Sequence, residues 1–523
     1  MSYANITNPA NFQLQDFAQF GFRVITTDFI PVPGEQYRTL YVLQDAVVTA
    51  TTQKGDDITS KAILAGTLLH GLFNSVSITS GRVLAYAAGR VTADEIIALY
   101  EAYVVALGGT LENTQCAIDA INEEGVDLFA DASLVMIPEG YGTGVVYGQR
   151  PLTSDSQLTF TRASDATRVG PDGAIAVVGS NVPRLDYLGS SCPRLLLEPQ
   201  RSNLVLFSEQ MNVWTNGTAS VTANATTSPD GYQNADSINN TADVSTFVGA
   251  SNVAHTFSLF VKQGTSATAS IDMSDGATGD VITTFTFATK TFSGTSAGGS
   301  WTSPSTAYQD YGNGWYRISL TATKGAGSEI GYKIIASGTG TTFVWGAQLE
   351  QGYASSYINT LGAAVTRGQD QAEKASISSL IGATEGTMFV DILFTGAADN
   401  NPAYIQTWAS QTERLGLFYS NSGNLIRPYL VSSGETDFSL GFTPTAGTRY
   451  KMAFCYKAND YAFFVNGSQV TIDAKAAVPT AGTKLFVGCL DSAAQANRQF
   501  SNINQALLFT SRLSNADLAA LTA

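Results

Sequence analysis

Short runs of alternating apolar and polar residues recur along most of this chain. The runs Leu72–Thr79, Val281–Phe287 and Trp315–Thr321 alternate in this way, and Gly, Ser and Asp residues separate such runs. A period of two residues is typical of a β-strand with one buried face, and the separating residues favour turns. The pattern therefore predicts a mainly β protein built from antiparallel sheets.

Length and composition support several such sheets. At about 150 residues per domain, the 523 residues predict three or four domains and exclude a single small module. Hydrophobic residues make up 44% of the chain and charged residues 14%, a mixture too apolar for disorder. The 49 glycines, against 15 prolines, fit a fold with many turns.

The net charge excludes two classes of partner. With 28 basic and 43 acidic side chains the formal charge is −15, which repels nucleic-acid phosphates and anionic lipids. The chain has no stretch of about 20 apolar residues, so we expect no membrane insertion. Its first residues, MSYAN, lack the basic and apolar regions of a secretion signal, which predicts synthesis in the cytoplasm without secretion.

Histidine and cysteine usage narrows the chemistry. His70 and His255 are the only histidines, which excludes a multi-histidine metal centre, and we expect His255 to be a packed strand residue. The cysteines show no CxxC spacing, which excludes zinc ribbons and thioredoxin chemistry. Cys455 and Cys489 could lie opposite each other in one sheet, but we expect them to be free buried thiols. The full set is Cys116, Cys192, Cys455 and Cys489.

Changes of pattern divide the chain into five segments. Thr92 and Glu95 form a capping box before an apolar period of helical spacing, and a second helix is predicted over Glu112–Asn122. Sequence runs of strand length lie before and after these helices. The predicted segments are a small N-terminal β-domain that serves as an anchor (1–90), a helical neck (91–137), an Arg-rich collar or linker (138–202) and two β-sandwiches (203–375 and 376–523).

Five arginines gather in the collar of a chain that is otherwise poor in arginine. Guanidinium groups suit buried or interfacial pairing with carboxylates such as Asp165, Asp186 and Glu198. We therefore expect an interlocking interface between domains or subunits, with a solvated loop as the alternative. The arginines are Arg162, Arg168, Arg184, Arg194 and Arg201.

Motifs in the first sandwich segment carry a resemblance to a known family. Gly312–Arg317 (GNGWYR), Trp345–Gly352 (WGAQLEQG) and Ser355–Thr360 (SSYINT) together resemble the carbohydrate-binding-module-like jelly roll of bacteriophage fibre and tail proteins. Three collar motifs look like the segment that precedes this jelly roll. They are Phe160–Ser164, Pro183–Tyr187 and Leu197–Leu204.

The last segment is similar to concanavalin-like lectin and laminin-G sandwiches. The likeness lies in the hairpin Tyr461–Val470, which has an Asn-Gly turn, and in the stretch Ala506–Ser514. Ser514 also begins a short closing helix, for which Asp517 completes a weak capping box.

Together these likenesses imply a bacteriophage virion fibre, of the head or of the tail, that acts as an adhesin. Its N-terminal region would dock on other virion proteins, and its lectin-like domains would bind glycans on the host surface. Such fibres are usually homotrimers, in which a closed assembly covers edge strands and several weak sites bind with avidity. The resemblance implies localisation in the virion and names no ligand.

Aromatic residues in turn-rich stretches and in the last domain are the candidate carbohydrate-binding residues. Sugar sites stack such rings on the apolar faces of sugars and surround them with amide and carboxylate groups. Burial in a sandwich core is the alternative for each ring, and we assign Trp315 and Trp345 to core. The candidates are Trp301, Tyr308 and Tyr311 in the first sandwich, and Trp408, Tyr419 and Tyr429 in the second.

Two other functions stay open, a glycan depolymerase and a capsid decoration or cement protein. A depolymerase needs two carboxylates about 5 to 10 Å apart, for which Asp370 with Glu373, or Asp391, are the residues to inspect. We find no repeat of about 20 to 50 residues of the kind that β-helical tailspikes show. We predict no catalytic residue, cofactor or metal site, since the loop residues Asp491 and Asn459-Asp460 lack EF-hand spacing.

Overall fold

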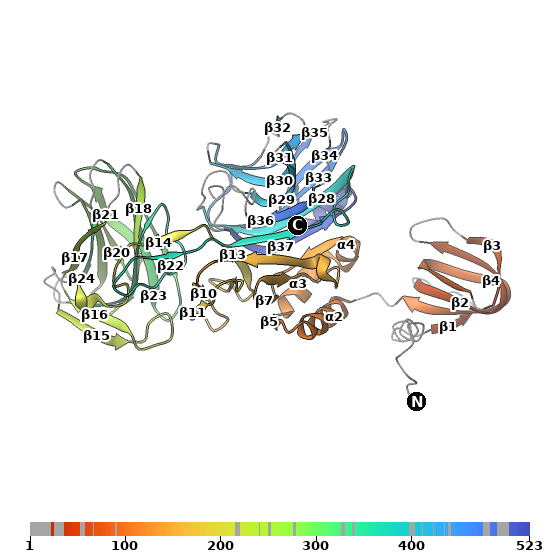
Figure 1. Ribbon diagram of the computed structural model, residues 1–523, viewed down its shortest axis with the longest axis horizontal. Helices are drawn as coiled ribbons and strands as arrows, with labels where there is room; N and C mark the ends of the chain where they lie inside the picture. Colours follow the sequence, from red (N-terminus) through yellow and green to blue (C-terminus); the bar gives the residue numbers. More distant parts are fainter. Residues whose placement is uncertain are drawn as a thin grey trace. The chain divides into compact units, whose positions relative to one another are not determined.

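The computed structural model describes residues 22–25, 36–52, 58–65, 67–88, 92–214, 220–239, 241–248, 253–275, 279–325, 330–336, 340–396, 403–410, 412–421, 423–432, 435–437, 441–473, 478, 482–488 and 501–523. The chain forms two compact units, Met1–Ile96 and Ile97–Ala523. Antiparallel sheets dominate both, which confirms the predicted mainly β fold (Figure 1).

The N-terminal unit is a four-stranded antiparallel sheet with the order β1-β4-β2-β3. Its buried side chains, such as Val42, Val48 and Val76, alternate with exposed ones and make a small core on one face. The strands are β1 (Phe22–Ile25), β2 (Gln36–Thr52), β3 (Ile58–Ile63) and β4 (Leu68–Ala88).

A first β-sandwich follows the collar, with a six-stranded sheet packed on a five-stranded one. Alternation is clear in β20, where Val281, Thr283 and Phe285 are buried and their neighbours are not. The six-stranded sheet contains, in order, β15 (Ser220–Thr226), β16 (Ala235–Asn239), β25 (Thr341–Gln351), β18 (Ala254–Gln263), β23 (Trp315–Lys324) and β22 (Trp301–Asp310). The five-stranded sheet contains β17 (Thr241–Val248), β24 (Ile330–Ala336), β19 (Thr268–Ser274), β20 (Asp280–Thr286) and β21 (Thr291–Ala297).

A second β-sandwich encloses the other large core, to which Met388, Ile405 and Leu508 contribute. Its eight-stranded sheet runs β12 (Leu185–Asp186), β13 (Arg194–Leu197), β37 (Ser501–Phe509), β28 (Glu385–Phe394), β33 (Thr448–Lys457), β34 (Tyr461–Val465) and β35 (Ser468–Asp473), with β6 (Leu134–Met136) also on β37. The ten-stranded sheet runs β32 (Glu435–Asp437), β31 (Leu425–Ser432), β30 (Glu413–Ser420), β29 (Ala403–Ser410), β36 (Lys484–Val487), β27 (Gln371–Ala375), β9 (Gln157–Thr161), β8 (Val145–Tyr147), β7 (Gly140–Gly142) and β5 (Thr110–Leu111).

Segments 91–137 and 138–202 therefore contribute strands to the second sandwich. β5, β7, β8 and β9 complete one of its sheets, while β6, β12 and β13 complete the other. Other collar strands lie outside these two sheets: β10 (Ala166–Val169) pairs with β11 (Ile175–Val178), and β14 (Arg201–Asn203) pairs with β26 (Val365–Arg367).

The local predictions for turns and helices are confirmed. Asn466 and Gly467 have φ angles of 45° and 75° at the turn between β34 and β35. Ser514 accepts a hydrogen bond from the Asp517 backbone N–H at the start of α5 (Asn515–Leu521). The neck contains α2 (Ala93–Ala106), α3 (Gln115–Glu124) and α4 (Val126–Asp131). No helix among the described residues is long and apolar enough to cross a membrane.

The collar arginines occupy different surroundings. Arg162 and Arg184 are fully buried and pair with Asp370, and Arg184 Nη1 also lies 2.6 Å from Glu198 Oε2. The solvated-loop alternative is therefore wrong for these two. Arg168 pairs with Glu112, and Arg194 donates a hydrogen bond to Asn504. Arg201 lies over the ring of Tyr353.

The predicted acidic partners are correct for Glu198 and wrong for the other two. Glu198 also pairs with Arg367, which lies just before the second sandwich. Asp165 is exposed, and the buried Asp186 accepts hydrogen bonds from backbone N–H groups instead. Asp370, the partner that Arg162 and Arg184 share, comes from a chain segment outside the collar.

Cysteine and histidine placement adds one unforeseen bond. Cys116 on α3 forms a disulfide with Cys192 of the collar, a pair separated by 76 residues and lacking any local spacing signal. Cys455 is a buried free thiol, as predicted, whereas Cys489 lies outside the described residues. His255 is 2% exposed within β18, as predicted, and burial lowers its pKa.

Candidate functional site

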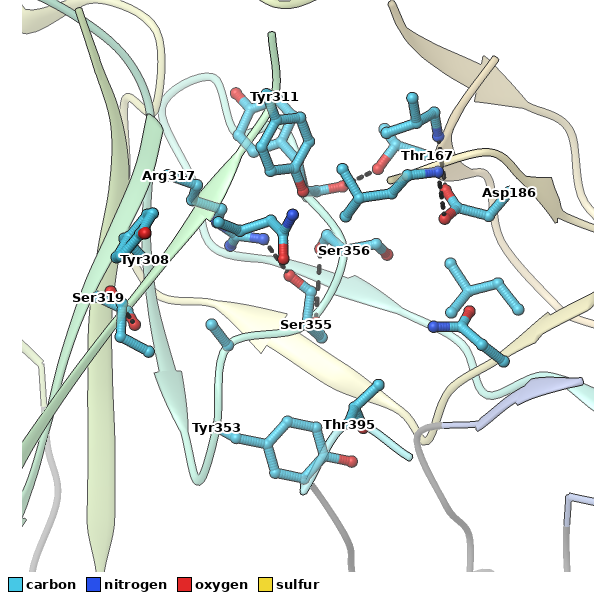
Figure 2. Close-up of a pocket in the computed structure, with 18 of the residues that line it drawn as sticks. Thr167, Asp186, Tyr308, Tyr311, Arg317, Ser319, Tyr353, Ser355, Ser356 and Thr395 are labelled. Carbon is cyan, nitrogen blue, oxygen red and sulfur yellow. Dashed lines mark hydrogen bonds between the residues drawn. The ribbon is translucent and has the colours of Figure 1, made fainter. Parts of the chain in front are cut away.

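A cavity of about 520 Å³ opens where the first sandwich meets the collar and the second sandwich (Figure 2). Strands β22 and β23 and the loop 353–357 form one wall. The collar strands β10 to β12 and residues at the ends of β28 and β37 form the rest. The cavity thus depends on several stretches that are distant in sequence.

Four tyrosines line this cavity, Tyr308, Tyr311, Tyr353 and Tyr357, and Figure 2 labels the first three. Tyr308 is 43% exposed, and its ring is held against Phe285 with a centroid distance of 5.6 Å. Tyr311 is half-buried and packs edge-on against Phe260 at 4.8 Å. The ring of Tyr353 lies under the guanidinium group of Arg201, 4.5 Å from it. The register pairs Tyr308 with the core residue Ile318, so its ring lies on the face of β22 that packs against the sandwich core. Tyr311 and Tyr353 are therefore the rings available for stacking against a sugar.

The cavity wall also contains polar atoms that have no hydrogen-bond partner among the described residues. Arg317 is 7% exposed, donates from Nη2 to Ser258 Oγ at 2.9 Å and from Nη1 to the Ser355 carbonyl, yet its Nε is unpartnered. Asn502 is also 7% exposed, and its Oδ1 is unpartnered. Arg168 Nε is the third such atom.

Leaving a buried donor or acceptor unpaired costs about 1–3 kcal/mol, so such atoms are rare without a cause. These three atoms are themselves buried, so they lie behind the surface of the cavity. The lining itself combines tyrosine rings with the hydroxyl and amide side chains of Ser319, Thr321 and Gln309, and the volume suits a monosaccharide or short oligosaccharide.

Asp186 is the only carboxylate among the residues that line the cavity. Its oxygens accept hydrogen bonds from the backbone N–H groups of Val169 at 2.7 Å and Leu188 at 3.1 Å. Burial raises the pKa of Asp186, and those two hydrogen bonds oppose the rise. A two-carboxylate hydrolysis mechanism needs two acids. The lining of this cavity contains one, Asp186, and its oxygens already accept hydrogen bonds from the backbone.

The acids inspected for depolymerase chemistry lie elsewhere. Asp370 is held by Arg162 and Arg184, and the buried Asp391 is paired with Arg449. Glu373 accepts a hydrogen bond from Gln371. These side chains belong to ion pairs and to the surface of a sheet, not to the cavity lining.

Two of the predicted aromatic residues, Tyr308 and Tyr311, line the cavity. The expectation of an open ring at Trp301 is wrong, because that side chain is 3% exposed and lies in the sandwich core beneath Lys324. Trp315 and Trp345 are 2% and 1% exposed, as their assignment to core predicted.

The three candidates of the second sandwich lie outside the cavity lining. Arg414 lies over Trp408 at 5.3 Å and over Tyr429 at 5.0 Å, and it also donates to the Tyr429 hydroxyl. Tyr419 packs on Phe394, and its hydroxyl donates to Asn424. Trp408 and Tyr429 are thus engaged within their own sheet, whereas Tyr419 packs on β28 of the facing sheet.

Sequence reasoning missed Arg317, Asn502 and Tyr353. Arg317 belongs to the motif GNGWYR, but alternation within a strand does not predict that this arginine forms no ion pair with a described residue. Asn502 and Tyr353 carry no signal of their own, because only tertiary packing brings β37 and the loop after β25 to the same cavity.

Metal ligation finds no support in the part of the chain that the structure describes. No group of three His, Cys, Asp or Glu side chains there is arranged to hold a metal ion. Asp460 pairs with Arg512 at 2.8 Å, and Asp491 lies outside the described residues.

No protein-family model matches the chain, and no curated protein matches it by sequence. Among solved structures, the CBM40 domain of Ruminococcus gnavus IT-sialidase bound to α2,3-sialyllactose is 14% identical with a TM-score of 0.24, covering 27% of this chain and 84% of that one. Domain 4 of AbnA, a GH43 extracellular arabinanase from Geobacillus stearothermophilus in complex with arabinotriose, is 12% identical with a TM-score of 0.26, covering 33% and 82%.

A sialidase from Trypanosoma rangeli is 9% identical with a TM-score of 0.26, covering 47% of this chain and 48% of that one. At these values the similarity decides nothing about function. The function of this chain is inferred from its own residues.

Proposed function

We propose that this protein is a non-enzymatic bacteriophage virion fibre, of head or tail, that adheres to host surface glycans through the cavity beside Tyr308 and Tyr311. The observation that carries the glycan part is the joint presence of tyrosines and of hydroxyl and amide side chains in the lining of one cavity. The resemblance of the motifs around Trp315 and Trp345 to phage fibre jelly rolls supports the virion part.

Sugar recognition needs both features at once. An aromatic ring covers the C–H face of a pyranose, while hydroxyl groups around the ring edge need directional donors and acceptors. Tyr311 and Tyr353 supply rings, and the side chains of Gln309, Ser319 and Thr321 supply polar groups. Because these groups sit on or beside packed strands, little ordering is needed on binding, which favours affinity.

The N-terminal unit supports a role in docking, since it is a compact unit with its own core, separate from the unit that contains the cavity. We propose that it binds another virion protein and that the fibre is a homotrimer, whose three weak sites gain avidity on a glycan-coated cell. Antibody labelling of intact phage particles tests the location: label confined to fibres supports it, and label absent from particles contradicts it.

A glycan array probed with the full chain tests adhesion. We expect binding to at least one class of host surface glycan, and we expect Tyr353→Ala to weaken it because a ring of the cavity lining is lost. Tyr232→Ala is the matched control, since Tyr232 is 73% exposed and does not line the cavity. Absence of binding to every envelope glycan and polysaccharide would remove the adhesion function.

A further inference from the structure

We propose that the ligand is an extended stretch of a glycan chain and not a single terminal sugar, and that it runs along the outer face of β23 into a second hollow beside Trp315. The inference rests on the proposed glycan-binding function and specifies the class of glycan. It follows from two hollows that adjoin at one tyrosine and from the strand that runs past both of them.

The second hollow has a volume of about 310 Å³ and lies at one end of the first sandwich. The turn between β22 and β23, the loop between β15 and β16 and the tip of the collar hairpin β10–β11 form most of its wall. Tyr311 lines this hollow and also the larger cavity of about 520 Å³. The two hollows therefore adjoin at Tyr311, and a ligand longer than one sugar can occupy both.

Strand β23 runs past both hollows. Its core residues Ile318 and Leu320 point into the sandwich, and successive side chains of a strand point to opposite faces. Trp315, Ser319 and Thr321 therefore share the outer face, which points away from the core. Trp315 lines the second hollow, whereas Ser319 and Thr321 line the larger cavity. At about 3.3 Å per residue, the path from Trp315 to Thr321 is about 20 Å long, which suits several linked sugars.

Hydrogen bonds between its walls hold the second hollow in shape. Trp315 Nε1 donates to the Thr227 carbonyl at 3.1 Å, and the Ile175 backbone N–H donates to the Pro229 carbonyl at 2.8 Å. The Trp315 backbone N–H donates to the Gly312 carbonyl at 2.8 Å, which closes the turn between the two strands. The hollow is therefore preformed, and little ordering is needed when a ligand binds.

Solvent-accessible polar side chains line the second hollow. Asp172, Thr227 and Asn313 are exposed, and Lys262 is half-buried. Lys262 lies over the Trp315 ring, with its Nζ 6.0 Å from the ring centroid. One anion, one cation, a hydroxyl and an amide suit the donors and acceptors of sugar hydroxyl groups. Because Trp315 is 2% exposed, this hollow contributes polar contacts, and stacking is left to the tyrosines of the larger cavity.

The test compares glycans of one composition and increasing length, and it uses the full wild-type chain. The probes run from the monosaccharide to the hexasaccharide in three series, β1,4-linked N-acetylglucosamine, α1,6-linked glucose and α2,8-linked sialic acid, measured by isothermal titration calorimetry. If the glycan array shows binding only to a glycan of another composition, its own oligomers are the probes. In the series that binds, we expect Kd to fall by about tenfold or more from the disaccharide to the tetrasaccharide and to level off at the hexasaccharide.

The outcomes separate this inference from the proposed function. Equal affinity for the disaccharide and the hexasaccharide contradicts an extended site and leaves glycan binding in place. Affinity that rises only in proportion to chain length also contradicts it, because that result indicates one short site that binds any unit of the chain. If no glycan of any kind binds, including on the array, both the inference and the proposed function fail.

Variants of the second hollow test its share in binding. Lys262→Met keeps an apolar stem over the Trp315 ring and removes the ammonium group. Asn313→Gly removes the amide, and glycine readily adopts the φ angle of 51° found at this position. We expect each variant to weaken binding of the hexasaccharide by about threefold or more and to change binding of the disaccharide little. A merely structural role would not produce this split.

Two exposed positions outside both hollows provide matched controls. Lys61→Met changes a lysine of the N-terminal unit, and Asn459→Gly changes an asparagine with a φ angle of 61° in the turn between β33 and β34. Neither should alter the affinity for the hexasaccharide. Equal losses for short and long oligomers in Lys262→Met and Asn313→Gly, or no loss in either, would overturn the role of the second hollow.

Discussion

Arg184 and Arg317 are both almost fully buried in the same unit, yet their surroundings differ in kind. Arg184 contacts two carboxylates, Glu198 and Asp370, whereas Arg317 contacts a carbonyl, a hydroxyl and a ring. The Nε of each has no partner among the described residues, so spare donors do not distinguish them. Ion pairs with two carboxylates hold distant chain segments together, whereas neutral partners supply only hydrogen bonds. The type of partner, not burial, therefore separates the two arginines.

The largest expected effect comes from breaking the satisfied cluster. Arg184→Gln leaves the buried Glu198 and Asp370 with less positive charge around them, and we expect a loss of about 3–5 kcal/mol in unfolding free energy. Arg317→Gln removes two hydrogen bonds and no ion pair, so its cost should be smaller. Scanning calorimetry measures both variants. Equal destabilisation by the two would show that the comparison between them is mistaken.

The pH dependence of the same cluster gives the next effect. Burial alone would raise the pKa of Glu198, but Arg367 and Arg184 outweigh it and lower the pKa from 4.5 to about 2. A carboxyl group with a lowered pKa in the folded state stabilises the protein above its unfolded pKa, and the gain is lost as pH falls through the folded value. We expect up to about 3 kcal/mol to disappear between pH 4.5 and pH 2.

Thermal unfolding followed across that acidic range checks this expectation. Glu198→Gln is the matching variant, because it removes the titrating group. Its stability should be lower at neutral pH and flatter in acid than that of the wild type. The same acid dependence in both proteins would assign the effect to other carboxyl groups.

The smallest effect concerns the aromatic wall of the cavity. Tyr353→Phe keeps the ring and its contact with Arg201, so we expect glycan affinity within about threefold of the wild type. Tyr353→Ala removes the stacking surface, worth about 0.5–1.5 kcal/mol, and should weaken binding by up to about tenfold. Calorimetric titration with whichever glycan binds the wild type measures both. A larger loss for Tyr353→Phe than for Tyr353→Ala would show that the hydroxyl, not the ring, recognises the ligand.

Local features of the fold were predictable because their causes are local. The period of two in Val281–Phe287 reports which face of β20 is buried, and the Asn466-Gly467 turn needs positive φ angles that these residues adopt readily. The helix after Ser514 begins where a hydroxyl can cap it. Each of these depends on contacts within a few residues.

The site was only partly predictable, because contacts between distant parts of the chain form it. Tyr308 and Tyr311 were candidates because ring type and turn context are visible in the sequence, but the same criteria selected Trp301, which is buried. Nothing local distinguishes a ring that faces a cavity from one that faces the core. The disulfide between Cys116 and Cys192 escaped detection for the same reason, since its two ends are 76 residues apart.

From its sequence alone, this protein is determined to be an acidic chain of alternating strands with arginines concentrated in one segment, because alternation, turns and charge are properties of neighbouring residues. Only the tertiary structure decided which of those arginines meet carboxylates and which polar side chains line a cavity. Arg184 meets Asp370, 186 residues away, and the cavity takes Arg317 from β23 and Asn502 from β37. Such encounters depend on how whole sheets pack, and packing is set by all the apolar surfaces together.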